Sequence, residues 1–186
     1  MKKVALVLMA IVLVGSVAMS QGMAKSGQWG IQTSLGVASS PVRTTPTVGL
    51  KFMASENLAV RVEAGFNSYS PAGGGNTTTG YAFGAGFEYH MTAVGSVSPY
   101  VGFQAGYGGG STGGGGSTQT SFGAAGVWGG EYFFSSNFSW GGEVGIGFTS
   151  TSNVLTGVDI NGLPIYGTRS EIGTGSATLI ATWYLN

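Results

Sequence analysis

The residues of this chain that could do chemistry are a few charged side chains set within apolar segments. Only 8% of the 186 residues are charged, and the formal net charge is zero. In LAVRVEAGF, residues 58–66, Arg61 and Glu63 stand two apart in an otherwise apolar run. Residues two apart on a β-strand share a face. Ion pairing, a gated ion path and enzymatic acid–base work are the chemistries that such a charged face could support.

The enzymatic alternative depends on Glu88 and His90, which share a face in GYAFGAGFEYHM. His90 is the only histidine of the chain, and the sequence places no serine against it, so a catalytic triad is not expected. GGGSTG at 108–113 satisfies G-x-G-x-x-G, but no helical pattern follows and no P-loop lysine is present. These patterns predict a surface loop, no enzymatic activity, no cofactor and no metal.

The segments that carry the charges alternate between apolar and polar residues with period two, which is typical of β-strands. One face of each segment is aliphatic and aromatic, and the other is rich in glycine. The eight predicted strands cover residues 29–37, 47–54, 58–68, 80–91, 99–108, 121–133, 138–148 and 177–185.

The connections between these strands alternate in length. Short turns follow strands two, four and six, whereas long segments at 69–79, 109–119 and 149–170 follow strands three, five and seven. Asn161-Gly162 is a hairpin signal within the last of them, so strands seven and eight are expected to protrude. Short turns at one end and long loops at the other are typical of outer-membrane barrels.

The apolar face is better suited to lipid than to a buried core. The glycine-rich face carries too few charges to solubilise a surface of this size. The alternative, a secreted β-sandwich with core aromatics, stays open at this point. Aromatic residues gather near both ends of the strands, which predicts two interfacial girdles. The girdle at the short-turn end is predicted to contain Trp29, Tyr89, Tyr132, Trp140 and Trp183.

The N-terminus has the layout of a secretory signal peptide. Lys2 and Lys3 precede an apolar run from Val4 to about Met19, and small residues follow. This run is shorter than the roughly 20 apolar residues that a spanning helix needs. Cleavage is expected after Ser20 or Ala24, so residues 1–24 are assigned to the signal peptide and residues 25–186 to a barrel.

The mature chain resembles the small eight-stranded outer-membrane barrels of the OmpA/OmpX type. The resemblance rests on the signal peptide, the strand count, the loop asymmetry and segments such as GAGFEYHM and GGEYFFSSNFSWGGEVGIGF. It implies an all-β, eight-stranded, antiparallel up-and-down transmembrane β-barrel in the bacterial outer membrane. Members of this class usually end on an aromatic residue, whereas this chain ends on Asn186 after Trp183-Tyr184-Leu185. No peptidoglycan-binding domain is expected after the eighth strand.

The barrel topology predicts where the charges meet. A Lys or Arg that faces lipid at the midplane costs about 2 to 4 kcal/mol, so the charged face should line the lumen. Strand two then lies across from strand six and strand three across from strand seven, so Lys51 should face Glu131 and Arg61 should face Glu143. The predicted ion-pair cluster comprises Lys51, Arg61, Glu63, Glu88, Glu131 and Glu143, with His90 and Gln104 nearby. Its carboxylates outnumber its cations, so either water reaches them or one carboxylate, or His90, carries a proton.

The function expected from these features is a non-enzymatic outer-membrane barrel that contributes to envelope integrity and surface interaction, with a plugged lumen. The alternative is a narrow channel or conduit for small or apolar solutes. The expected partners are outer-membrane lipid and lipopolysaccharide, the barrel assembly machinery and an extracellular ligand at the loops. The neutral charge balance argues against nucleic acid.

Overall fold

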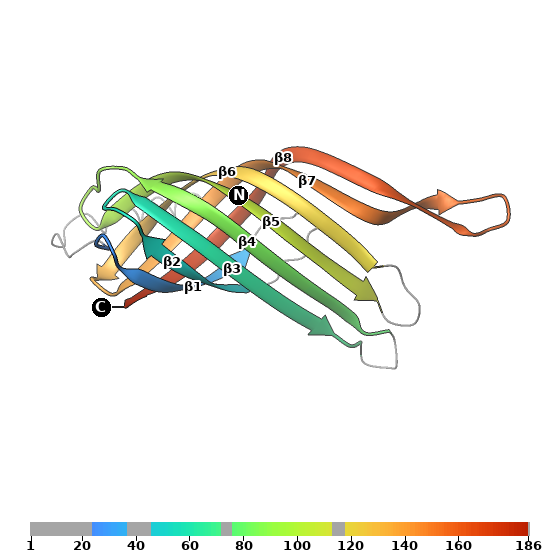
Figure 1. Ribbon diagram of the computed structural model, residues 1–186, viewed down its shortest axis with the longest axis horizontal. Coiled ribbons are helices and arrows are strands. Elements are labelled where there is room, and N and C mark those ends of the chain that lie inside the picture. The colour runs from blue at the N-terminus through green and yellow to red at the C-terminus, as the bar shows by residue number, and fades with distance from the viewer. Residues whose placement is uncertain (1–23, 37–45, 72–75, 113–117, 186) are drawn as a thin grey trace, which may run out of the picture.

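Eight antiparallel strands close into one barrel in the computed structural model, which describes residues 24–36, 46–71, 76–112 and 118–185 (Figure 1). Apart from Ala24, the predicted signal peptide lies outside these described residues. The strands are β1 (Trp29–Gly36), β2 (Thr47–Met53), β3 (Leu58–Tyr69), β4 (Thr78–His90), β5 (Val97–Thr112), β6 (Thr118–Ser135), β7 (Phe138–Val158) and β8 (Pro164–Leu185).

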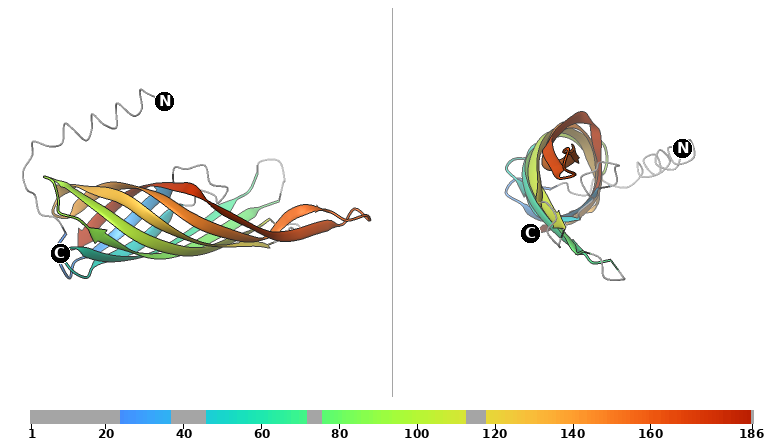
Figure 2. Two further views of the ribbon diagram at one scale, coloured as in Figure 1. Left: turned by 90° about the horizontal axis from the view of Figure 1, so that it is seen from above. Right: turned by 90° about the vertical axis from the view of Figure 1, so that its right-hand side faces the viewer.

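The barrel closes because β8 pairs with β1, from Trp29 opposite Leu185 to Gly36 opposite Thr178. Every other strand pairs with its neighbours in sequence order, so the predicted all-β, up-and-down barrel of eight strands is confirmed. The turns β2–β3, β4–β5 and β6–β7 lie together at the end that holds the C-terminus, here called the short-turn end (Figures 1 and 2). None of the described residues lies in a helix long and apolar enough to cross a lipid bilayer.

The last hairpin extends far beyond the rest of the barrel. β7 has 21 residues and β8 has 22, and the end of this pair projects past the other strands (Figures 1 and 2). The predicted protrusion is therefore confirmed. Both strands are longer than predicted because their outer halves are rich in Ser, Thr and Gly, which weakens the period-two signal while the backbone ladder continues.

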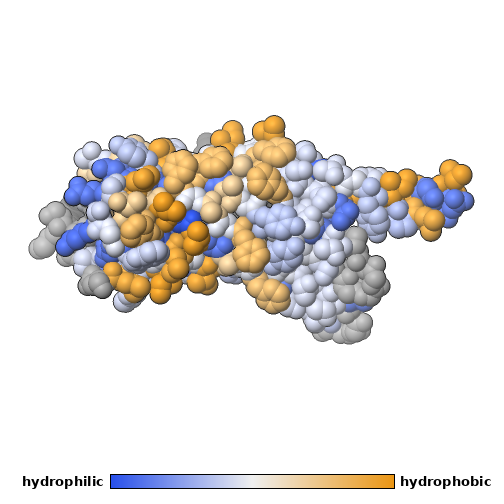
Figure 3. Space-filling model, in the orientation of Figure 1, coloured by the Kyte–Doolittle hydropathy of each residue, from blue (hydrophilic) through white to orange (hydrophobic). Residues whose placement is uncertain are grey.

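The polarity of the two faces of the barrel wall is the reverse of that in a soluble barrel, because apolar side chains point outward and charged side chains point inward. Outward side chains such as Val62, Trp128 and Ile146 are at least half exposed, and Figure 3 shows apolar surface over the middle of the barrel. The inward side chains are buried, and several of them are charged. The prediction that Arg61 faces the interior while Val60 and Val62 face outward is confirmed by this pattern.

A cluster of buried apolar residues, here called the apolar floor, lies inside the barrel near the short-turn end. Met53, Ala59, Phe133 and Tyr184 are almost completely buried there and pack together with Ala24. The rings of Phe133 and Tyr184 are stacked with their centroids 5.7 Å apart. Tyr184 of this floor also donates to Glu131 through its hydroxyl, so the floor lies directly against the charged residues of the lumen.

Candidate functional site

Lys51 of β2 meets two carboxylates in the middle of the lumen. Its Nζ lies 2.6 Å from Glu88 Oε2 on β4 and 2.9 Å from Glu131 Oε2 on β6. The exposed fractions of the three side chains are 0%, 1% and 2%. The structure thus places Lys51 opposite Glu131. Glu88 is its second partner and comes from β4, which lies between β2 and β6 in the wall.

Arg61 of β3 forms a bidentate pair with Glu143 of β7. Nη1 donates to Glu143 Oε2 and Nη2 donates to Glu143 Oε1, both at 2.9 Å. Nη1 also donates to Glu88 Oε1 at 3.0 Å, and Nη2 donates to Gln104 Oε1 at 2.5 Å. The planar guanidinium suits this position because its fixed fork can satisfy several acceptors at once.

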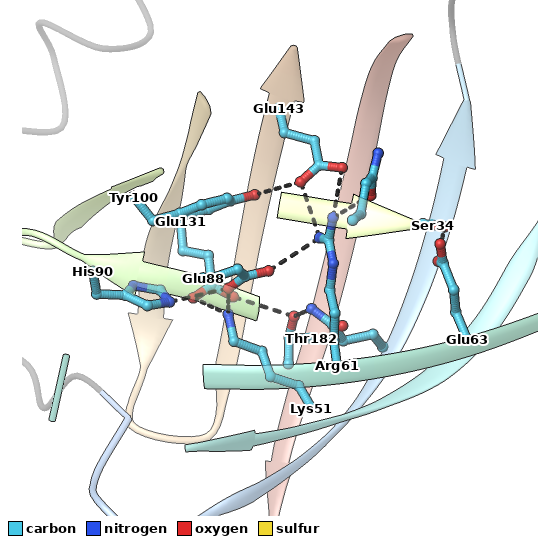
Figure 4. A network of polar contacts seen from close by, with 12 residues as sticks. Ser34, Lys51, Arg61, Glu63, Glu88, His90, Tyr100, Glu131, Glu143 and Thr182 are labelled. Atoms are coloured by element: carbon cyan, nitrogen blue, oxygen red, sulfur yellow. Dashed lines mark hydrogen bonds and ion pairs between the residues drawn. The ribbon is translucent and has the colours of Figure 1, made fainter. Parts of the chain in front are cut away.

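Glu88 joins the lysine and arginine pairs into one network. Oε2 contacts Lys51 Nζ, Oε1 accepts from Arg61, and His90 Nε2 lies 3.0 Å from Oε2. Figure 4 shows these side chains converging from β2, β3, β4, β6 and β7 across the interior. The name lumen network is used below for Lys51, Arg61, Glu88, His90, Glu131 and Glu143.

Hydroxyl groups satisfy the remaining acceptors of the network. Glu131 accepts hydrogen bonds from Ser139 Oγ at 3.0 Å, Thr182 Oγ1 at 3.3 Å and Tyr184 Oη at 3.1 Å. Tyr100 Oη donates to Glu143 Oε2 at 3.1 Å. Buried carboxylates need such partners because the desolvation cost of each charge is several kcal/mol. Period-two alternation puts Thr182 and Tyr184 on the face opposite Trp183, but it does not indicate that they bond to Glu131.

Glu63 does not join the network, contrary to the prediction. Its carboxylate accepts from Thr47 Oγ1 at 2.7 Å and from Ser34 Oγ at 3.3 Å. Glu63 stands one lumen-facing position nearer the long loops than Arg61, and the guanidinium is already engaged by Glu88, Glu143 and Gln104. No lysine or arginine of the described residues forms a salt bridge with Glu63, so two hydroxyls take that place.

His90 lies between a serine and a carboxylate, which the sequence did not predict. Its Nδ1 is 2.8 Å from Ser98 Oγ, and its Nε2 is 3.0 Å from Glu88 Oε2. These three residue types occur in catalytic triads. Ser98, His90 and Glu88 are, however, 3%, 4% and 1% exposed, and Glu88 also holds Lys51 and Arg61. The arrangement supports a buried hydrogen-bond chain that a substrate would not reach.

Ligand atoms of Glu88, His90 and Glu131 all lie within 4.8 Å of one another, which would suit a metal ion. Lys51 Nζ lies within 2.9 Å of both carboxylates and so takes the position of a cation between them. These residues therefore do not fit a resident metal while Lys51 is present. The network then holds two permanent cations and three carboxylates, and one proton on His90 or on a carboxylate would balance it.

Glycines make room for large lumen side chains beside the network, such as Tyr100 and Gln104. A Cβ at Gly129 would lie 2.7 Å from Tyr100 Oη and 2.6 Å from the carbonyl oxygen of Gly142. A Cβ at Gly86 would lie 2.7 Å from the carbonyl oxygen of Phe103 and 3.1 Å from Gln104 Cβ. The distances of 2.6 and 2.7 Å are shorter than Cβ contacts in folded proteins, so only glycine fits these two positions without a shift of the neighbouring atoms.

The predicted girdle residues lie on the outside of the barrel. Trp29, Tyr89, Trp140 and Trp183 are each about half exposed, and Tyr132 is partly exposed. Tyr132 and Trp140 face each other across β6 and β7 next to the β6–β7 turn. These aromatic side chains therefore form a band around the short-turn end.

No protein-family model and no curated protein sequence matches this chain. Among solved structures, the outer membrane protein OprG from Pseudomonas aeruginosa matches with a TM-score of 0.52 and 12% sequence identity. The match covers 88% of this chain and 98% of OprG. The chain has the fold of the small eight-stranded outer-membrane β-barrels.

Two other small barrels match with TM-scores just below 0.5. The N-terminal β-barrel domain of OprF from Pseudomonas aeruginosa has a TM-score of 0.49 and 13% identity, over 86% of this chain and 98% of that domain. Neisserial surface protein A has a TM-score of 0.48 and 20% identity, over 85% of this chain and 97% of its own length. At these identities the likeness concerns the small-barrel fold and not a shared activity.

Proposed function

We propose that this chain is a non-enzymatic barrel of the bacterial outer membrane whose lumen is closed by the lumen network, and that it contributes to envelope integrity and surface interaction. The observation that carries the proposal is the continuous chain of contacts from Lys51 through Glu88 to Arg61 and Glu143. Residues from opposite walls of the barrel meet in it, so the lumen is filled at this level.

Two further features support a closed lumen. An eight-stranded barrel encloses a space just wide enough for side chains to fill. The network occupies one layer of that space, and the apolar floor of Met53, Ala59, Phe133 and Tyr184 occupies the next layer toward the short turns. An ion would have to cross both layers, so we expect no steady conductance.

Placement in the outer membrane follows from the outward face and the sequence together. Large apolar side chains are exposed around the barrel, with Trp128 at 64% and Phe83 at 58%. Exposed apolar surface on this scale is costly in water, and lipid would cover it. Export by the signal peptide, insertion by the barrel assembly machinery and contact with outer-membrane lipid and lipopolysaccharide belong to this proposal.

The non-enzymatic part of the proposal rests on burial. Ser98 is hydrogen-bonded to His90, and both side chains are buried. Glu88, which would orient the histidine in a triad, is also the partner of Lys51 and Arg61. Its position is therefore explained by charge pairing without any catalytic role.

Surface interaction is supported by the tip of the β7–β8 hairpin. Ile160 is fully exposed, and Val158 and Leu163 are about two-thirds exposed. Asp159 Oδ1 accepts from the backbone N–H groups of Asn161 and Leu163 at 2.8 Å, so the tip is an ordered turn. An ordered apolar tip far from the membrane is suited to contact with an extracellular ligand.

The alternative function is a conduit for small or apolar solutes. It is favoured by the inner wall on the long-loop side of the network, where Gly106, Gly108 and Gly110 of β5 leave the wall bare and partly exposed. In this alternative the network would have to move aside for a solute to pass.

Conductance in planar lipid bilayers distinguishes the two functions. The proposal predicts that the refolded protein is silent and that Arg61→Ala, which empties the centre of the plug, produces leak currents. Glu63→Ala is the matched control because Glu63 faces the same lumen and, among the described residues, bonds to hydroxyls. If the wild type forms discrete channels and Arg61→Ala abolishes them, the closed lumen is contradicted and the conduit is supported.

A further inference from the structure

A row of hydroxyl side chains encircles much of the outer surface on the long-loop side of the barrel. Ser68 pairs with Thr79, Thr79 with Ser111, and Ser111 with Thr118, across strands β3 to β6. Two residues further along β6, Thr120 pairs with Ser152 of β7. The name hydroxyl collar is used below for Ser68, Thr79, Ser111, Thr118, Thr120 and Ser152.

The collar lies directly beyond a band of outward aromatic residues. Phe66, Tyr81 and Phe122 each stand two positions from a collar residue on the same strand and the same face. The ring centroids of Tyr81 and Tyr107 are 6.3 Å apart, so the band is continuous from β4 to β5. In Figure 3 the surface changes from apolar to pale toward the long loops. Since aromatic bands mark the edge of the hydrocarbon, the collar is at headgroup height.

Four of the six collar hydroxyls form two cross-strand hydrogen bonds and still have bonding capacity. Thr79 Oγ1 is 3.0 Å from Ser111 Oγ, and Thr120 Oγ1 is 2.6 Å from Ser152 Oγ. Each hydroxyl has one donor and two acceptor lone pairs, so one cross-strand bond leaves sites for an outside partner. The two pairs together present a fixed array of oxygen atoms toward the lipid.

No charged side chain lies on the outward face of the strands in the part of the chain that the structure describes. Most charged residues of that part line the lumen or sit at the turns or near the chain ends. Arg169 and Glu171 of β8 lie opposite the inward residues Thr151 and Thr149, and although their side chains are 62% and 40% exposed, they form a salt bridge with each other. Lipid phosphates are recognised through Arg and Lys, which supply charge-assisted hydrogen bonds. The collar therefore lacks the chemistry for a phosphate headgroup.

We propose that the hydroxyl collar binds neutral sugar headgroups of outer-leaflet glycolipids. Sugar hydroxyls both donate and accept hydrogen bonds, which matches the collar, and they need no cation on the protein. The aromatic band would hold the acyl boundary of the same lipids. This inference rests on the proposed function in one respect, since it requires the barrel to span a membrane.

Competition between lipids in mixed bilayers tests the inference. The refolded protein is placed in phosphatidylcholine bilayers that contain equal amounts of digalactosyldiacylglycerol, phosphatidylglycerol and lipid A, and the lipids that stay bound after mild extraction are counted by native mass spectrometry. We expect several-fold more galactolipid than either phosphate lipid, with no change in high salt or with a chelator of divalent cations. Equal retention of the three lipids, or a preference for lipid A that the chelator removes, would overturn the inference.

Two matched variants assign the binding to the collar. In the collar variant, Thr79→Val and Thr120→Val are combined with Ser111→Ala and Ser152→Ala, and the galactolipid excess should disappear. In the control variant, Ser121→Ala and Thr151→Val remove a hydroxyl pair 2.9 Å apart at the same height but on the inner face. The control should retain the excess, and equal behaviour of the two variants would overturn the assignment.

Migration of unboiled and boiled samples in SDS gels separates this inference from the proposed function. A folded membrane barrel should shift on boiling in the wild type and in both variants. A normal shift without any galactolipid excess would refute the collar alone, whereas the absence of a shift in the wild type would refute the barrel itself.

Discussion

Arg61 and Glu143 stand on strands at opposite sides of the barrel, and Nη1 and Nη2 of the arginine each donate to one oxygen of the carboxylate at 2.9 Å. This pair ties β3 to β7 directly through the interior, although the two strands are not neighbours in the wall. The arginine is about 5% exposed, and so is Glu143. The interaction is therefore a bond between two distant parts of the wall in a space with little access for water.

Arg61→Ala should strongly destabilise the barrel. The substitution leaves Glu143 and part of Glu88 buried without their cation, and breaking a buried ion pair costs about 3 to 5 kcal/mol. Unfolding in urea, followed by the difference between unboiled and boiled migration in gels, should show the loss. Glu63→Gln should have a much smaller effect, because the partners of Glu63 in the described part of the chain are the hydroxyls of Ser34 and Thr47.

Lys51→Ala should create a metal site. Without the ammonium, the ligand atoms of Glu88, His90 and Glu131 remain within 4.8 Å of one another, which suits Zn²⁺ with its preference for histidine and carboxylate ligands. Isothermal titration of the refolded variant should show one bound zinc ion, and the wild type should show none. The double variant Lys51→Ala and His90→Ala should bind much more weakly. Zinc binding by the wild type would mean that Lys51 does not hold the cation position.

Gly129→Ala should be destabilising, and Gly126→Ala should not. A Cβ at Gly129 would meet Tyr100 and the backbone of Gly142, and overpacking of this kind costs about 1 to 3 kcal/mol. A Cβ at Gly126, on the outward face of the same strand, would have nothing within 4 Å. The urea midpoints of the two variants provide the comparison, and equal midpoints would contradict the tight packing around Tyr100.

The turn at the tip of the β7–β8 hairpin should lose its stabilisation by Asp159 only when the pH is low. Hydrogen bonds from the backbone N–H of Leu163, and then of Asn161, hold the pKa of the Asp159 carboxyl below its usual value. A lowered pKa in the folded state means that the turn is fully stabilised above the usual range for Asp, near pH 4, and loses this contribution as the pH falls through the lower value. Protection of the Asn161 and Leu163 amides from hydrogen exchange should therefore stay constant from neutral pH to about pH 5. Loss of this amide protection already above about pH 5 in the wild type, or full protection in Asp159→Ala, would contradict a turn that is held by the Asp159 carboxylate.

The fold and the centre of the site were predictable because they depend on alternation and topology. Period-two patterning showed that Arg61 and Val62 face opposite sides, and sequence-order closure of eight strands places Lys51 near Glu131 and Arg61 near Glu143. Both arguments use only the direction of a side chain and the order of the strands. Neither argument depends on which residues pair between neighbouring strands.

The details that the sequence did not predict concern the position of each lumen side chain along the barrel axis and how far it extends into the lumen. Glu63 shares the face of Arg61, but a shift of one lumen-facing position put it beside Ser34 and Thr47. Ser98 reaches His90 because β5 begins at Val97, earlier than the alternation indicated. Phe133 shares the lumen face of Glu131 and belongs to the floor, but its strand had the least regular pattern. Such details depend on the stagger of neighbouring strands, which alternation does not report.

Single-channel conductance of the refolded protein in planar lipid bilayers tests the closed lumen most directly. The lumen network predicts a silent membrane for the wild type and for Glu63→Ala, and leak currents for Arg61→Ala. Steady, discrete openings of the wild type would contradict the plug, because they would show an ion path through the layer where Lys51, Glu88 and Glu131 meet.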